Sequence, residues 1–282
     1  MSKDVRIGDA LGYGWNTTIS NLGRLFAIYL LYAVITAAAS GPRNSRMLPE
    51  GIASDVVETI LWLAETLLSF WLSAGFILFF LLLVRFRPPD VATIFKGGSY
   101  FLKYMFASVL TWLLMAVAFI PGAVVIVIEW FWLIFGSGLE PLQQMTDAPS
   151  IQNWLEFVEQ SGISLIVALI FIGIFIIPPF YVSVMVMFAP YLIVDRGLGP
   201  IEAMKASARI TKGGRMGLIN FMVVSWFVYL AGALALLVGL LVAMPVVQIA
   251  TVWLYVHLIR QTEHQLGETI GDPDYLTLEN HA

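Results

Sequence analysis

Long apolar runs alternate with short polar segments along the chain, and each run has about the length of a membrane helix. A transmembrane helix needs about 20 mostly apolar residues. The last run, from Met216 to Ile259, is about twice that length, so it is read as two spans. We expect the turn between them at Gly239 to Pro245, because glycine and proline interrupt helices. The runs predict an all-α, polytopic membrane helix bundle with six spans, at about 22–40, 60–84, 104–135, 163–194, 216–238 and 242–260.

Polar segments with helical periodicity precede the first, third and fifth spans. In the first segment Ile7, Leu11 and Trp15 recur at every fourth position, which places them on one face of a helix. The second segment begins at Asp90, a potential helix cap. It has apolar residues at Val91, Ile94 and Phe95, and it ends at the glycine pair Gly97-Gly98. Both segments are predicted to form short helices on the cytoplasmic side.

The third such segment has the clearest pattern. It begins at Pro200 and ends at Gly213-Gly214, which are typical first and last residues of a helix. Its predicted apolar stripe consists of Ile201, Met204 and Ala208, and its charged stripe of Glu202, Lys205, Arg209 and Lys212. Such a helix can lie in the headgroup layer with its cations toward anionic lipid. The three segments indicate three copies of one unit, a short helix followed by two spans. The alternative is that any cytoplasmic loop is basic and broken by glycine.

The composition excludes a soluble protein. Hydrophobic residues make up 59% of the chain and charged residues 12%, whereas soluble domains have about 45–50% and about 25%. The net charge of -4 does not favour nucleic acid as a partner. The absence of cysteine excludes disulfides and thiolate metal sites. Residues 1–260 are therefore expected to form a single membrane domain, followed by a polar, acidic cytoplasmic tail at 261–282.

The basic residues predict the orientation in the membrane, because lysine and arginine in short loops stay cytoplasmic. Of the 15 basic residues, only Arg43 and Arg46 fall in the gap between the first and second predicted spans. The other 13 lie on the opposite side, at both ends of the chain and in the second and fourth gaps. We therefore expect a multi-pass protein with both termini in the cytoplasm.

A family resemblance rests on Gly199-Pro200-Ile201-Glu202-Ala203-Met204-Lys205-Ala206-Ser207, together with the preceding segment from Tyr191. This stretch resembles a signature of the YciC-type family of uncharacterised bacterial inner-membrane proteins. It is also similar to the membrane domain attached to some glycerophosphodiester phosphodiesterases. The segments Asp9–Trp15 and Ala250–Tyr255 look like the opening helix and last span of those families. The resemblance implies a bacterial cytoplasmic (inner) membrane and six spans, but no established chemistry. The catalytic phosphodiesterase barrel has no counterpart here.

Prolines within two predicted spans suggest a ligand pocket. Pro178 and Pro179 are expected to break or kink the fourth span, because proline removes a backbone hydrogen bond. Pro121 makes a similar weak point in the third span, and Glu129 is one of two ionisable residues within spans. Interrupted helices side by side form the central site of many transporters. The alternative is that these prolines are ordinary kinks.

A second candidate site is the basic side of the cytoplasmic helices. Trp15, Lys205, Arg209 and Lys212 are candidate contacts for lipid headgroups or a partner protein. The alternative is a solvated helix face. His257 and His264 lie seven residues apart, a poor spacing for a metal site. No Gly-x-Ser-x-Gly motif appears, so no catalytic residue, metal or cofactor is predicted.

These patterns favour a non-enzymatic integral membrane protein with a role in envelope or lipid organisation, acting through lipid or partner contacts. The alternative is a transporter or lipid-handling protein with its site at the proline-containing third and fourth spans. The expected partners are membrane lipid and either a membrane protein or a second copy of the chain, and not nucleic acid.

Overall fold

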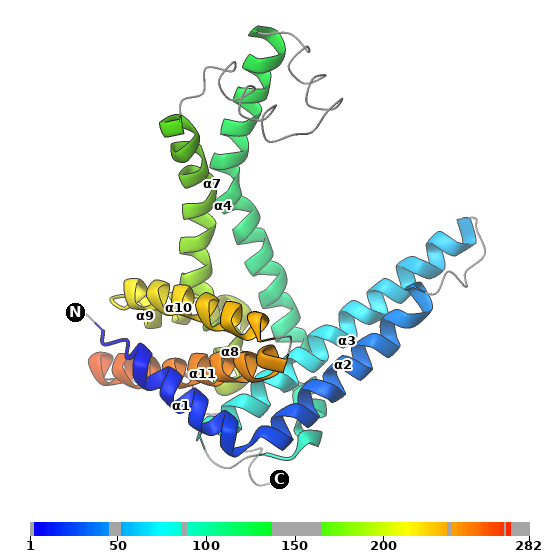
Figure 1. The fold of residues 1–282 in the computed structure, drawn as a ribbon, viewed down its shortest axis with the longest axis vertical. Helices are drawn as coiled ribbons and strands as arrows, with labels where there is room; N and C mark the ends of the chain where they lie inside the picture. Colours follow the sequence, from blue (N-terminus) through cyan, green and yellow to red (C-terminus); the bar gives the residue numbers. More distant parts are fainter. Residues whose placement is uncertain are drawn as a thin grey trace. The chain divides into compact units, whose positions relative to one another are not determined.

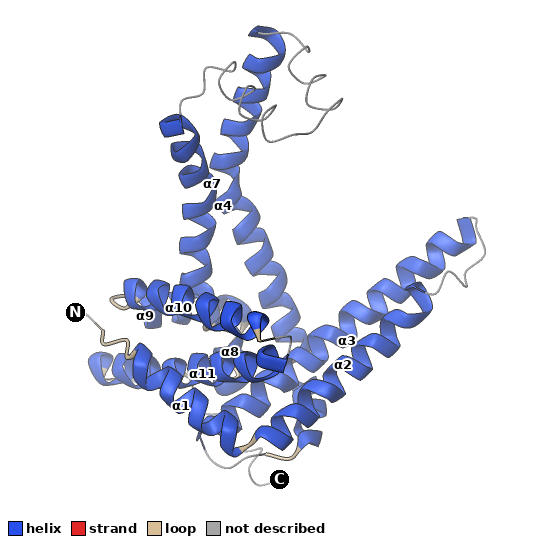
Figure 2. Ribbon diagram, viewed as in Figure 1, coloured by secondary structure: helices blue, strands red, loops and turns tan. Residues whose placement is uncertain are grey.

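The computed structural model describes residues 3–44, 52–85, 89–136, 165–235, 238–267 and 269–271. These residues are helical and include no β-strand, which confirms the all-α prediction (Figures 1 and 2). In chain order the elements are α1 (Ile7–Ser20), α2 (Leu22–Asn44), α3 (Ile52–Arg85), the 3-10 helix η1 (Val91–Ser99), α4 (Phe101–Gly136), α7 (Leu165–Val186), α8 (Ala189–Arg196), α9 (Pro200–Thr211), α10 (Arg215–Leu234) and α11 (Val238–Leu266).

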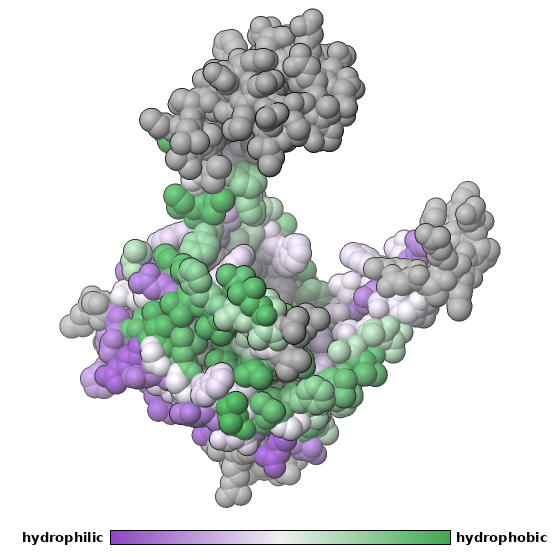
Figure 3. All heavy atoms as spheres, in the orientation of Figure 1, coloured by the Kyte–Doolittle hydropathy of each residue, from purple (hydrophilic) through white to green (hydrophobic). Residues whose placement is uncertain are grey.

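Within the described residues, six helical stretches are long and apolar enough to cross a bilayer. They are Leu22–Gly41, Val56–Arg85, Phe101–Val125, Gly173–Arg196, Arg215–Leu234 and Gly239–Leu266. Their outward faces are apolar: Trp112, Trp226 and Leu234 are each more than three-quarters exposed. Figure 3 shows hydrophobic residues along α2 and over α10, and hydrophilic residues where α1 begins and α11 ends. Because water disfavours so large an exposed apolar surface, the protein is a multi-pass membrane protein.

The chain forms two compact units. The first comprises Met1–Leu110 and Val184–Ala282, and the second comprises Thr111–Ser183. Helices α4 and α7 contribute residues to both units. The largest fully buried hydrophobic side chains lie in the first unit, and include Phe79, Phe80, Phe188, Leu192 and Tyr255.

In the first unit, helices occur at the three positions predicted before the odd-numbered spans. Here α1, η1 and α9 are called the pre-span helices. Helix α1 packs against α11, η1 packs against α3, and α9 packs against α8 and α11. Each pre-span helix thus contacts the second span of the neighbouring pair, in a cyclic order. This is the pattern of contacts that a three-fold repeat would produce.

Small residues form the buried faces of the pre-span helices. On α1 the buried residues are Ala10, Gly14 and Thr18, whereas Trp15 of the predicted apolar stripe is exposed. A side chain at Gly14 would collide with the backbone carbonyl of Val246 in α11. The same small-residue spacing recurs on α9, at Ala203, Ser207 and Thr211. Small residues allow helix backbones to approach closely, as in many membrane proteins.

The contact between η1 and α3 is made by two glycines. A Cβ at Gly75 of α3 would collide with the carbonyl of Ile94, and a Cβ at Gly97 would collide with the backbone of Gly75. The 3-10 helix therefore runs against the middle of the second span, with its backbone in direct contact. The segment was predicted to form a short helix on the cytoplasmic side of the membrane, and the structure has a 3-10 helix there that packs against a span.

The final two spans are joined earlier than predicted. Helix α10 ends at Leu234 and α11 begins at Val238, so Gly239 and Pro245 lie inside α11 and the predicted turn between them is wrong. Gly239 is used for packing, since a Cβ there would collide with the carbonyl of Gly232 in α10. Helix α11 also continues through Gln261 to Leu266, into the segment expected to be a tail.

The second unit contains the proline residues singled out in the sequence. Helix α4 continues through Pro121, and α7 continues through Pro178 and Pro179, so neither helix is broken at these prolines, and a kink there stays a prediction. At Gly122 the two helices touch, because a Cβ there would collide with the side chain of Phe175. The ring of Phe119 also packs on Phe175, with their centroids 5.0 Å apart.

Candidate functional site

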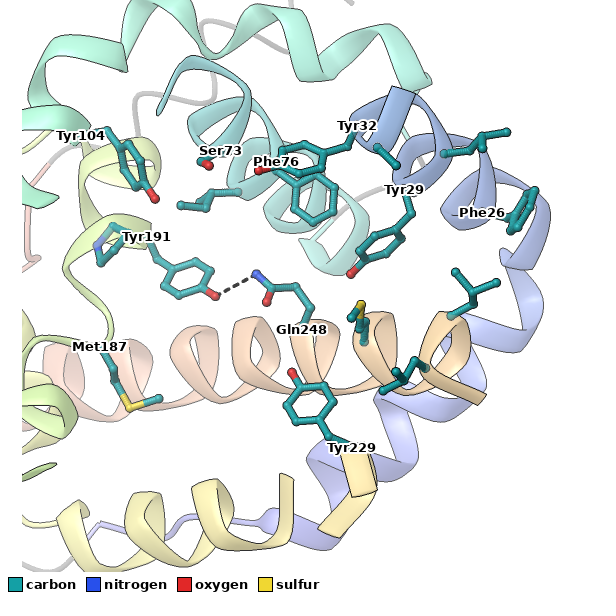
Figure 4. A pocket seen from close by; sticks show the side chains of 17 residues that line it. Phe26, Tyr29, Tyr32, Ser73, Phe76, Tyr104, Met187, Tyr191, Tyr229 and Gln248 are labelled. Carbon is teal, nitrogen blue, oxygen red and sulfur yellow. Dashed lines mark hydrogen bonds between the residues drawn. The ribbon is translucent and has the colours of Figure 1, made fainter. Parts of the chain in front are cut away.

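A cavity of about 980 Å³ lies within the first unit (Figure 4). All of its lining residues belong to that unit, and they come from α2, α3, α4, α8, α10, α11 and the α7–α8 junction. They are Phe26, Tyr29, Leu30, Tyr32, Ala33, Ser73, Phe76, Ile77, Tyr104, Met187, Pro190, Tyr191, Tyr229, Leu240, Leu241, Met244 and Gln248. Its volume is at the upper end of the range for small-molecule sites, about 300–1,000 Å³.

The polar groups of the cavity are neutral. Side chains of Tyr29, Tyr104, Tyr191, Tyr229 and Gln248 converge on the space from different helices (Figure 4). Gln248 Nε2 donates a hydrogen bond of 3.1 Å to the Tyr191 hydroxyl. The lining residues include no lysine, arginine, histidine, aspartate or glutamate. The cavity therefore offers hydroxyl donors and an amide in an uncharged, aromatic environment.

Aromatic contacts hold one wall of the cavity in place. Phe76 of α3 packs edge-on against Tyr29 of α2, with ring centroids 5.1 Å apart. Phe76 also contacts Tyr32 at 5.7 Å and Phe80 at 5.0 Å. Such aromatic pairs stabilise packing by about 0.5–1.5 kcal/mol each beyond the area that they bury.

The fourth span breaks beside the cavity, at Met187-Phe188, where α7 ends and α8 begins. The Ser207 hydroxyl of α9 occupies this break. It donates to the backbone carbonyl of Met185 at 2.7 Å and accepts from the backbone N–H of Phe188 at 3.2 Å. A buried backbone group without a hydrogen-bond partner costs about 1–3 kcal/mol. The Ser207 hydroxyl provides the partners that the interrupted helix lacks. Pro190, near the start of α8, lacks the N–H that would continue the helix.

A buried ionic cluster fixes α8 one turn beyond Tyr191. Asp195 is 1% exposed, and its Oδ2 accepts hydrogen bonds from Arg85 at 2.7 Å, from the Tyr255 hydroxyl at 2.6 Å and from Arg196 Nε at 3.3 Å. These partners join the end of α3, the end of α8 and the middle of α11. Because the Tyr255 ring also stacks on Tyr191, with centroids 5.6 Å apart, the cluster sets the position of a cavity residue.

Further contacts extend this cluster along the same end of the first unit. Arg196 forms an ion pair of 3.0 Å with Glu263, whose Oε1 also accepts from the backbone N–H of Ile270 at 3.1 Å. Lys103 Nζ donates to the carbonyl of Gly197 at 2.6 Å. Gly197 has φ of 60°, which a residue with a side chain adopts at a cost, and it ends α8. These bonds tie α4, α8 and α11 together.

The residues predicted to bind a ligand lie elsewhere. Pro121, Pro178 and Pro179 belong to the second unit, and none of them lines the cavity. The side chain of Glu129 lies outside the described residues. The predicted headgroup contacts Trp15, Lys205, Arg209 and Lys212 are all exposed.

Sequence reasoning did not single out the residues that form the cavity. Gln248 was visible as an amide within an apolar span, and a polar group at that depth needs a partner. Tyr191, Asp195 and Ser207 all lie in the stretch on which the family resemblance rests. Their partners, however, come from distant segments, so the sequence pattern gave no sign of their contacts.

Comparisons of the chain with protein-family models, with curated proteins and with solved structures find no match. The cavity and the charged helix faces are thus interpreted from their own chemistry.

Proposed function

We propose that this protein acts without catalysis in lipid organisation, by holding a neutral membrane lipid in the tyrosine-lined cavity. The observation that carries the proposal is the cavity's lining, which combines apolar walls with several tyrosine hydroxyls and one amide but no charged group. Burying an unpaired charged headgroup there would cost much more than burying a neutral one. A lipid whose polar part carries ester, amide, ketone or hydroxyl oxygens would satisfy the tyrosine donors.

The rim of the cavity supports entry from the bilayer. Phe26, Leu30, Leu241 and Met244 line the cavity, and each is between two-fifths and about half exposed. In a membrane these side chains meet lipid chains. An acyl or isoprenoid chain can therefore extend from the cavity into the bilayer while its polar part stays near Gln248.

Lipid co-purification tests this function. The protein is extracted in a mild detergent, washed and analysed for bound lipid by mass spectrometry. We expect one class of neutral lipid to be retained at about one molecule per chain. The double variant Tyr191→Phe, Gln248→Leu keeps the shape of the site but removes two polar groups, so retention should fall about tenfold or more.

The matched control is Tyr13→Phe, which removes a tyrosine hydroxyl of the same unit that donates to the Val84 carbonyl and does not line the cavity. It should retain lipid like the wild type. The proposal is wrong if the wild-type protein retains no neutral lipid, or if the double variant retains as much as the control.

A second candidate function is transbilayer movement of such a lipid, and the break in the fourth span favours it. Discontinuous helices beside a binding site are a recurrent feature of transporters, and Met187, Pro190 and Tyr191 at this break line the cavity. Proteoliposomes with a fluorescent neutral lipid would separate the two functions. Binding without movement supports the first. Movement that is lost on Pro178→Ala with Pro179→Ala would instead place the site at the prolines of the second unit.

The cytoplasmic position of both termini, the bacterial inner membrane and membership of the YciC-type family are part of this proposal. The orientation is supported by the 13 of 15 basic residues on one predicted side. Because the chain has no cysteine, single cysteines can be labelled without background. In intact cells a membrane-impermeant maleimide should label Gln152→Cys, in the predicted external loop, and should not label Asp4→Cys. The opposite pattern would reverse the orientation.

A further inference from the structure

Helix α9 has two faces of different chemistry. Its inner face is buried against α8 and α11 and includes Ala203, Ser207 and Ile210. Its outer face is exposed and carries Lys205 and Arg209, with exposed Lys212 directly after its last residue and Glu202 as its only carboxylate. Three cations and one carboxylate leave an excess of two positive charges on this face.

The position of α9 in the chain places its outer face at the edge of the bilayer. The span α10 begins at Arg215, three residues after Lys212. Met216, in the first turn of α10, is 71% exposed, and Trp226 further along the helix is 78% exposed. These apolar side chains face lipid. Because α9 precedes the span by a single short turn, we expect its cations to lie at the depth of the headgroups.

The backbone of α9 is held rigidly. Lys3, itself only 7% exposed, donates from Nζ to the carbonyls of Arg209 at 3.0 Å and Ile210 at 2.6 Å, and to Thr262 Oγ1 at 2.8 Å. At the other end, the Gly199 N–H donates to the Glu202 carboxylate at 3.4 Å. A helix fixed at both ends presents its cations in one arrangement, which lowers the entropic cost of binding.

We infer that the outer face of α9 binds the headgroups of anionic phospholipids. Charge complementarity and depth carry the inference, because the cations of Lys205, Arg209 and Lys212 lie at the level of phosphate groups. The exposed side chains of Ile201 and Met216 flank these cations with apolar contacts. An acidic protein partner would need to reach the same depth in the membrane. The site differs from the cavity in its residues and in the charge of its ligand. Binding at α9 can therefore be tested independently of the cavity's function.

Lipid exchange in nanodiscs tests the inference. The full-length protein is placed in nanodiscs of phosphatidylcholine containing a small fraction of phosphatidylglycerol, and the lipids that remain bound are counted by native mass spectrometry. We expect the wild type to retain phosphatidylglycerol preferentially. Each cation near an anionic headgroup strengthens binding about fivefold. The variant Lys205→Gln, Arg209→Gln, Lys212→Gln should therefore lose its preference about a hundredfold, and salt should weaken the wild-type preference.

The matched control removes three exposed cations from other helices, with the variant Arg24→Gln, Lys96→Gln, Arg260→Gln. It should keep most of the preference. An equal loss in the control would show that net charge, rather than α9, attracts the lipid, and would overturn the inference. So would unchanged retention in the α9 variant. Because all three α9 side chains are exposed, the melting temperature in pure phosphatidylcholine should match the wild type, which separates lost binding from misfolding.

Discussion

The helix backbone is interrupted beside the tyrosine-lined cavity of the first unit, but it is continuous at the proline-containing contact of the second unit. In the first, the fourth span is broken at Met187-Phe188 and the freed backbone groups are satisfied by Ser207. In the second, the helix continues through Pro178 and Pro179, and Gly122 brings α4 into contact with α7. A proline alone therefore does not mark an opening between helices. The break occurs where a side chain from another helix can pair with the backbone.

The largest expected effect comes from the ionic cluster that positions the cavity wall. Asp195→Asn removes the carboxylate that pairs with Arg85, which is only 10% exposed, and with Arg196. Removing this buried carboxylate from the centre of the cluster should destabilise the first unit by about 3–5 kcal/mol. Unfolding in mixed detergent micelles measures this. The control Asp9→Asn affects a solvent-exposed pair with Arg6 and should change stability by less than about 1 kcal/mol. Equal effects would mean that the cluster has no special role.

A second pair of variants compares the packing of the two regions directly. Gly122→Ala puts a methyl group where Phe175 already lies, so α4 and α7 must separate, at a cost of about 1–3 kcal/mol. Ala33→Leu adds three carbons at a position that faces the cavity, and it should cost little stability because space is present. The same change should reduce lipid retention by filling the site. If Ala33→Leu proves the more destabilising of the two, the cavity is not open space.

Ser207→Ala tests whether the helix break depends on its hydroxyl partner. The variant leaves the Met185 carbonyl and the Phe188 N–H without their bond to α9, which should cost about 1–3 kcal/mol. Ser225→Ala is a matched buried control, since that hydroxyl only adds a bond to the carbonyl of Phe221 four residues earlier in the same helix. Its effect should be smaller. Thermal unfolding followed by circular dichroism compares the two, and a larger loss in Ser225→Ala would contradict the role given to Ser207.

A further expected effect is a pH dependence confined to the first unit. Burial lowers the pKa of Lys3 from 10.5 to about 8. Between these values the unfolded chain keeps a proton that the folded chain has lost, so the unfolding free energy should rise with pH from about 8 to about 10.5 on account of this residue. Below pH 8 the contribution is constant. The difference between wild type and Lys3→Met, measured at pH 7, 9 and 10.5, isolates this residue. A difference that does not change with pH would contradict the lowered pKa.

Local patterns were enough to predict the helical elements. The apolar runs predicted six spans because a membrane helix must satisfy its own backbone hydrogen bonds along about 20 apolar residues. Pro200 and the Gly213-Gly214 pair bracketed α9, which runs from Pro200 to Thr211. The turn before α11 was misplaced because Gly239 serves close packing against Gly232, a use that a sequence pattern does not distinguish from helix termination.

The sequence by itself determined an all-α membrane protein, its spans and the positions of the pre-span helices, because hydrophobicity and helix ends are properties of neighbouring residues. Only the tertiary structure decided which faces are buried and where the cavity lies. Tyr29, Tyr191 and Gln248 meet although more than 200 residues separate the first from the last. Asp195 likewise accepts hydrogen bonds from Arg85 and Tyr255, which lie 110 and 60 positions away in the chain. Such contacts depend on how the helices pack, and helix periodicity alone carries no information about them.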